Sequence, residues 1–75
     1  PLQFHYAGHD DHIPPAAVQQ VRDTFAGRAG TEVHVYPGSM HGFNCWARAS
    51  YHAPSAALAH GRSLQFLART LMAAA

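Results

Sequence analysis

Residues 36–43 read Tyr36-Pro37-Gly38-Ser39-Met40-His41-Gly42-Phe43, and this stretch decides how the rest of the chain is interpreted. It follows a short run in which Val33 and Val35 alternate with His34 and Tyr36, a pattern typical of a strand. Proline cannot continue a strand ladder and glycine permits a tight turn, so the strand is predicted to end at this Pro-Gly pair. His41 then lies on a loop just past the end of a strand, where ligands bind in open α/β sheets. Two interpretations remain open at this point, an ordinary loop histidine and a catalytic one.

Predicted strands and helices alternate along the whole chain. Apolar periodicity, a Pro-Pro pair that can begin a helix, and glycines that can end one mark the boundaries. The expected elements are a strand over 2–7, a helix from Pro15 to about Arg28, a strand over 32–36 and a helix from Pro54 to about Met72. A strand, a crossover helix and a second strand favour a parallel pair with a right-handed connection.

The expected fold class is therefore α/β, a strand-helix-strand-helix piece of a parallel sheet. Two strands alone leave sheet edges and one face open, although parallel sheets are normally covered by helices and contain more strands. We expect the chain either to be a piece of a larger sheet or to complete its sheet with another copy of itself. A first residue that is proline rather than methionine favours a piece of a longer polypeptide.

Composition excludes several classes of function. The 75 residues are at most one domain, and 48% hydrophobic with 12% charged residues is too apolar for disorder. The five cationic residues are scattered arginines, so no basic stripe indicates a nucleic-acid partner. No apolar run is long enough for a membrane span and no signal peptide is visible, so the expected location is the cytoplasm. Cys45 is the only cysteine, which rules out an internal disulfide and a multi-cysteine zinc site.

A second chemical feature follows the first predicted strand. Its loop carries Asp10 and Asp11, whereas the loop after the second predicted strand carries His41. Loops that follow neighbouring parallel strands emerge at the same edge of a sheet, so a carboxylate and an imidazole can meet there. An aspartate that accepts a hydrogen bond from a histidine selects its tautomer and stabilises its protonated form, as a hydrolase triad requires. Taken alone, Asp11 could equally satisfy the free amides at a helix N-terminus.

Both loops resemble a known family. Residues 8–14, Gly8-His9-Asp10-Asp11-His12-Ile13-Pro14, resemble the G-x-x-D-x-x-P loop of the dienelactone hydrolase family, within the α/β-hydrolase superfamily. Residues 36–43 resemble its Y-P-G-x-x-H-G-F loop, and the segment around Leu64-Gln65-Phe66-Leu67 is similar to its closing helix. The resemblance implies that residues 1–75 are the C-terminal segment of such a domain. It also implies that Asp11 is the triad acid and His41 the general base of a carboxylic ester or lactone hydrolase.

Other parts of such an enzyme do not occur in the sequence. The nucleophile turn, G-x-S-x-G or G-x-C-x-G, is absent, and the oxyanion hole depends on that turn. Whether the nucleophile is serine or cysteine stays open, and the 75-residue chain alone is expected to be inactive. Family members that cleave dienelactone are expected to carry an arginine where Cys45 stands; Arg48 could reach the same region. The expected partners are a small ester or lactone and the remainder of the hydrolase domain.

Two alternatives compete with this interpretation. The histidines His5, His9 and His12 could form a metal cluster with the neighbouring aspartates, but one lies on a strand and the others on a loop, so neither a metal nor a cofactor is predicted. Alternatively, the chain could be a non-catalytic module whose open strand edges pair with another copy, as in a domain-swapped assembly.

Overall fold

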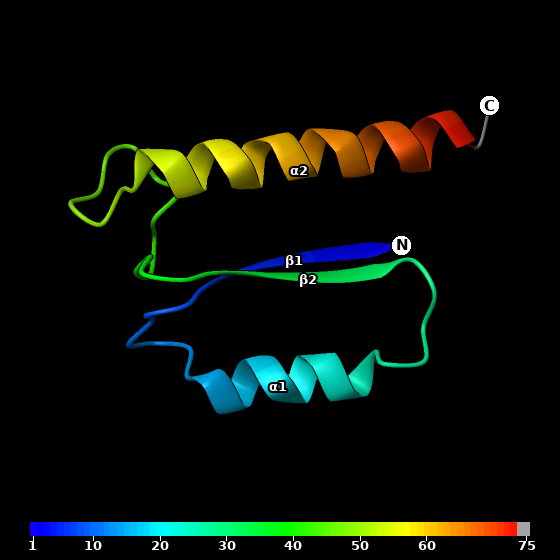
Figure 1. The fold of residues 1–75 in the computed structure, drawn as a ribbon, viewed down its shortest axis with the longest axis horizontal. Coiled ribbons are helices and arrows are strands. Elements are labelled where there is room, and N and C mark those ends of the chain that lie inside the picture. The colour runs from blue at the N-terminus through cyan, green and yellow to red at the C-terminus, as the bar shows by residue number, and fades with distance from the viewer. Residues whose placement is uncertain (74–75) are drawn as a thin grey trace.

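A computed structural model describes residues 1–73 of the chain. Four elements follow one another, the strand β1 (Leu2–Ala7), the helix α1 (Pro15–Thr24), the strand β2 (Thr31–Tyr36) and the helix α2 (Ala53–Ala73). The predicted strand-helix-strand-helix order is confirmed (Figure 1). In this described part of the chain, no helix combines the length and the apolar character that a membrane span requires.

The two strands pair in parallel, as the crossover helix between them predicted. Leu2 lies opposite Thr31 and Ala7 opposite Tyr36, so the strands begin and end together. His5 and His34 are direct neighbours in this register, and their rings stack with centroids 5.6 Å apart. Because both strands run the same way and end together, their carboxyl ends and the loops that follow them share one edge.

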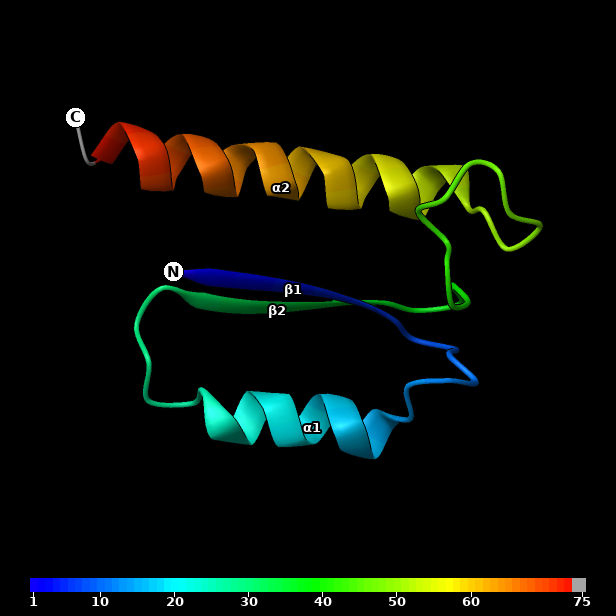
Figure 2. The ribbon, with the colours of Figure 1, turned by 180° about the vertical axis from the view of Figure 1, so that it is seen from behind.

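The sheet lies between the two helices, so the molecule has three layers (Figures 1 and 2). Phe4 stacks on Tyr6 and contacts Phe25, which places this face of β1 toward α1. Gln3 and His5, on the opposite face, contact α2. Alternate residues of β1 therefore face opposite helices, as the two-residue period of a strand requires.

Helix α1 ends earlier than predicted, at Thr24 rather than near Arg28. The amide of Phe25 still bonds the carbonyl of Val21, but Ala26 bonds Asp23 and Arg28 bonds Phe25. These last bonds span three residues rather than four, so the chain leaves the helix after Thr24 through tightened turns that include Gly27. The apolar spacing continued through Phe25 and gave no sign of this change.

Only one face of α2 is packed against the sheet. Ala59 on the packed side joins Ala7, Tyr36 and Phe43 in a small buried core. The large apolar side chains that lie more than half exposed on this helix are Leu64, Leu71 and Met72. The expected open sheet edges are present, because each strand of this two-stranded sheet has one unpaired edge in the described part of the chain. The expected open face is not, because a helix lies on either side of the sheet (Figures 1 and 2); the open apolar surface lies on α2 instead.

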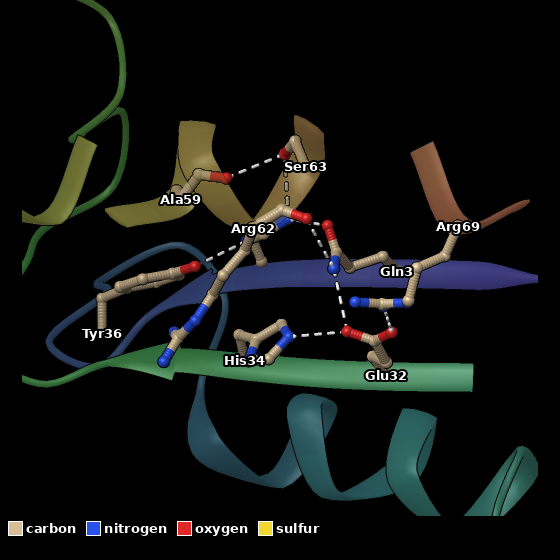
Figure 3. Close-up of polar contacts among 9 residues, drawn as sticks. Gln3, Glu32, His34, Tyr36, Ala59, Arg62, Ser63 and Arg69 are labelled. Carbon is tan, nitrogen blue, oxygen red and sulfur yellow. Dashed lines mark hydrogen bonds and ion pairs between the residues drawn. The ribbon is translucent and has the colours of Figure 1, made fainter. Parts of the chain in front are cut away.

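The contact between the sheet and α2 is largely polar (Figure 3). Glu32 accepts a hydrogen bond from Gln3 at 2.9 Å, bonds His34 at 3.0 Å and forms an ion pair with Arg69 of α2. The Arg62 guanidinium lies over the Tyr36 ring, 5.4 Å from its centroid. Hydrogen bonds from Gln3 and His34 and the positive charge of Arg69 hold the pKa of Glu32 below its ordinary value.

His5 lies inside this polar contact as a neutral imidazole. Its Nε2–H donates to the Gln3 side-chain oxygen at 2.7 Å, while its Nδ1 accepts from the Tyr36 hydroxyl at 2.7 Å. Burial, then the neighbouring His34 and then the Arg62 charge lower the pKa of His5. Both ring nitrogens of His5 are therefore occupied by hydrogen bonds within the contact between the sheet and α2.

The free energy of unfolding is expected to decrease as the pH falls below 6.5, the ordinary value for histidine. Unfolded His5 then takes up a proton that the folded protein resists, so acid favours the unfolded state until the folded pKa is reached. The variant His5→Gln cannot titrate and is expected to lose this part of the pH dependence, with His60→Gln on the exposed side of α2 as the matched control. Urea unfolding at about pH 7.5 and about pH 5.5 measures the difference. An unchanged pH dependence in His5→Gln would contradict the assignment.

Candidate active site

The loops that follow β1 and β2 lie side by side at the carboxyl ends of the strands. The Gly8 amide donates to the carbonyl of Tyr36 at 2.8 Å, and the His9 amide donates to the carbonyl of Ser39 at 2.9 Å. These two bonds hold the loops together directly past the ends of both strands. The predicted meeting of the two loops is confirmed by this geometry.

Gly8 is required for this close approach. A Cβ atom at this position would lie 2.9 Å from the Pro37 Cα and 3.0 Å from the Tyr36 carbonyl oxygen, both of which are backbone atoms. Since backbone cannot swing aside as a flexible side chain can, the loops would have to separate. Gly8 is thus the residue that allows the site to form.

The variant Gly8→Ala is expected to destabilise the chain by about 1–3 kcal/mol, the usual cost of forcing extra volume into a packed site. Gly27→Ala is the matched control, because nothing lies within 4 Å of the Cβ position there. Urea unfolding of both variants measures the two free energies. Equal stability of the two variants would show that the loops part without cost.

His41 pairs with Asp10 at this edge. The His41 Nδ1 lies 2.9 Å from the Asp10 Oδ2, with the Asp10 side chain 4% exposed and the His41 side chain 39% exposed. The other carboxylate oxygen, Oδ1, accepts from the amides of His12 at 2.7 Å and Ile13 at 2.9 Å. Burial raises the pKa of the Asp10 carboxyl, but hydrogen bonds from His41, Ile13 and His12 outweigh it and hold that pKa below its ordinary value.

Asp11, to which the family motif assigns the role of triad acid, does not bond His41 in this structure, where Asp10 does. The role of Asp11 stays a prediction. The Asp11 side chain is 86% exposed, and its Oδ1 lies 3.7 Å from the Nε2 of His12. The two backbone amides that bind Asp10 Oδ1 turn its second oxygen toward His41, and the next residue then points out of the loop. The motif spacing identifies which residue occupies the aspartate position of the family motif. The local hydrogen bonds decide which of the two adjacent carboxylates turns toward His41.

Two further residues contact His41 that sequence reasoning did not identify. The His12 ring lies 4.6 Å from the His41 ring between centroids, and the Ser50 hydroxyl donates to the His41 carbonyl at 2.7 Å. Gly42, next along the chain, has φ of 81°, and a Cβ there would collide with the Arg48 side chain. Sequence spacing does not indicate the contacts of His41 with His12 and Ser50, because these residues meet through loops of irregular shape.

An open cavity of about 570 Å³ borders the His41–Asp10 pair. Phe43, Cys45 and Arg48 line it together with the pair. Cys45 is exposed, and Arg48 lines the same cavity, so this arginine does reach the region of Cys45. An imidazole held by a carboxylate at the wall of a cavity can accept a proton from one reacting group and return it to another.

Fold and site together define a class of protein. It is a layered parallel α/β unit with a carboxylate–imidazole pair at the carboxyl ends of its strands. Within that class, the model of the dienelactone hydrolase family matches residues 1–71 of this sequence. The chain belongs to the dienelactone hydrolase family. The family resemblance of the two loop motifs is thereby confirmed.

Individual relatives support the same assignment. The carboxymethylenebutenolidases of Pseudomonas putida and Pseudomonas knackmussii are each 35% identical over 68 residues, which cover 91% of this chain and 29% of theirs. A protein of Escherichia coli (strain K12) is 42% identical over 57 residues, covering 75% of this chain and 21% of its own length. The chain thus spans less than a third of the length of these relatives.

Proposed function

We propose that this chain is the C-terminal segment of an α/β-hydrolase domain and supplies the general base and the acid of a carboxylic ester or lactone hydrolase. The observation that carries the proposal is the hydrogen bond between the His41 Nδ1 and a carboxylate of the neighbouring loop, beside an open cavity. Membership of the dienelactone hydrolase family supports a hydrolytic reaction on a small molecule.

His41 is the proposed general base. Its Nδ1–H donates to the carboxylate, which leaves Nε2 as the nitrogen that takes a proton. A serine or cysteine on a G-x-S-x-G or G-x-C-x-G turn elsewhere in the domain would attack the carbonyl carbon of the substrate as His41 accepts the proton of its hydroxyl or thiol group. His41 would then donate that proton to the leaving oxygen, and the carboxylate would stabilise the imidazolium in between.

The acid comes from the pair Asp10 and Asp11. The contact in the structure favours Asp10, because its carboxylate is buried against His41. The family motif favours Asp11, which stands third after Gly8 and third before Pro14. Both residues lie on the same loop, so the proposed chemistry is the same for either, and the two asparagine variants described in the Discussion assign the role.

The names of the Pseudomonas relatives indicate the first substrate to test, carboxymethylenebutenolide, which is a lactone. The experiment uses the complete protein that carries this chain and compares a butenolide lactone, an activated aryl ester and the matching anilide. We expect hydrolysis of the lactone or the ester well above that of the anilide. A folded protein that cleaves none of the three would overturn the proposal, and the 75-residue chain by itself is expected to cleave none because no nucleophile turn occurs in it.

Self-association is a second candidate function. Both strands of the two-stranded sheet have one unpaired edge, and the apolar side chains Leu64 and Leu71 are more than half exposed on α2. A second copy could cover these surfaces. Sedimentation equilibrium of the 75-residue chain tests this, since a well-folded monomer would exclude it.

A further inference from the structure

Ser39 is the most buried side chain of the loop between β2 and α2, with 1% of its surface exposed. Its hydroxyl donates to the Ser55 hydroxyl at 2.7 Å, and that hydroxyl lies 2.8 Å from the Nδ1 of His52. Because Ser39 supplies the proton of the first bond, the Ser55 hydroxyl is free to donate its own to His52. A buried hydrogen bond thus joins the loop of His41 to the first turn of α2, and a partly buried one continues it to His52.

The backbone of Ser39 makes two more connections. Its amide bonds the Tyr36 carbonyl at 3.2 Å, at the end of β2, and its carbonyl accepts from the His9 amide at 2.9 Å. His9 directly precedes Asp10 and His41 lies two residues after Ser39. One residue therefore bonds β2, the loop of the aspartates and α2 at the same time.

We propose that Ser39 is a positioning residue, whose hydroxyl sets the location of the His41 imidazole relative to the loop of the aspartates. This inference rests on the proposed function, because it assigns Ser39 a part in the same reaction. Alanine at this position keeps both backbone bonds but lacks the link to α2. Without that link, the segment that carries His41 can turn about the two backbone bonds, and a displacement of about 1 Å at a reacting group is enough to lower a rate strongly.

The test compares Ser39→Ala, Ser55→Ala and the double variant in the complete protein. Ser63→Ala is the matched control, because the Ser63 hydroxyl also lies partly buried on α2 but bonds Ala59 and His5 instead. We expect each single variant to lower kcat about tenfold with little change in KM, and the double variant to be no slower than either single one. The NMR titration of the His41 ring is expected to shift in these three variants and to stay unchanged in Ser63→Ala.

A Ser39→Ala protein that melts at a lower temperature, but keeps the His41 titration and the kcat of the control, would overturn the inference and leave Ser39 a purely structural residue. Should Ser39→Ala fail to fold, Ser55→Ala breaks the same hydroxyl pair from the helix side and is read by the same criteria. The proposed function fails separately if the His41→Ala variant keeps full activity. A shifted His41 titration in Ser39→Ala would in that case still show that Ser39 positions the imidazole.

Discussion

Replacing His41 with alanine is expected to lower kcat at least about a thousandfold in the complete protein. The proposed nucleophile is a poor attacking group until a base takes its proton, and alanine offers no base. Steady-state hydrolysis of the lactone or ester identified as a substrate measures the loss. His60→Ala, which removes an exposed histidine from α2, controls for a general effect of deleting an imidazole.

The His41→Ala prediction depends on the variant remaining folded. His41 is only partly buried, and its backbone carbonyl, which accepts from Ser50, is kept in the variant. Circular dichroism and the melting temperature are therefore expected to stay close to those of the parent protein. Near-normal turnover by a folded His41→Ala protein would reject the general-base role.

The two aspartate variants are expected to differ strongly from each other. On the contact in the structure, Asp10→Asn removes the negative charge beside His41 and should lower kcat by about a thousandfold or more, whereas Asp11→Asn changes an exposed side chain and should cost less than about tenfold. Asparagine is chosen because its side-chain oxygen can still accept from the amides of His12 and Ile13. The loop is thus kept while the charge is lost.

The reverse result has an equally definite meaning. A larger decrease of kcat in Asp11→Asn would show that Asp11 accepts the hydrogen bond of His41 in the complete domain, as the resemblance to the G-x-x-D-x-x-P motif implies. Measuring kcat for both variants on one substrate, together with the NMR titration of His41, distinguishes the two assignments.

Most of the fold could be predicted because it depends on local patterns. Alternating apolar residues defined β1 and β2, and Pro15 marked the beginning of α1 where a missing amide proton costs nothing. The parallel pairing followed from the crossover helix between the strands. The end of α1 was misplaced because the change from four-residue to three-residue hydrogen bonds leaves no trace in the apolar spacing.

The site was predicted only in part. His41 and the loop of the aspartates were identified, since a histidine and a carboxylate after neighbouring parallel strands must emerge at one edge. The same reasoning could not choose between Asp10 and Asp11, because the side chains of adjacent loop residues point in different directions. The contacts of Ser39 with Ser55 join positions 16 residues apart, and no spacing rule relates them.

By itself, the sequence determined the order of the elements, the edge at which the two loops meet and the family to which the chain belongs, because periodicity, turn residues and motifs are properties of neighbouring positions. Only the tertiary structure decided that Asp10 turns toward His41, that Gly8 must lack a side chain and that Ser39 joins three segments. Those features arise where backbones from separate segments come within hydrogen-bonding distance, and the positions that meet there are set by packing in three dimensions rather than by separation along the chain.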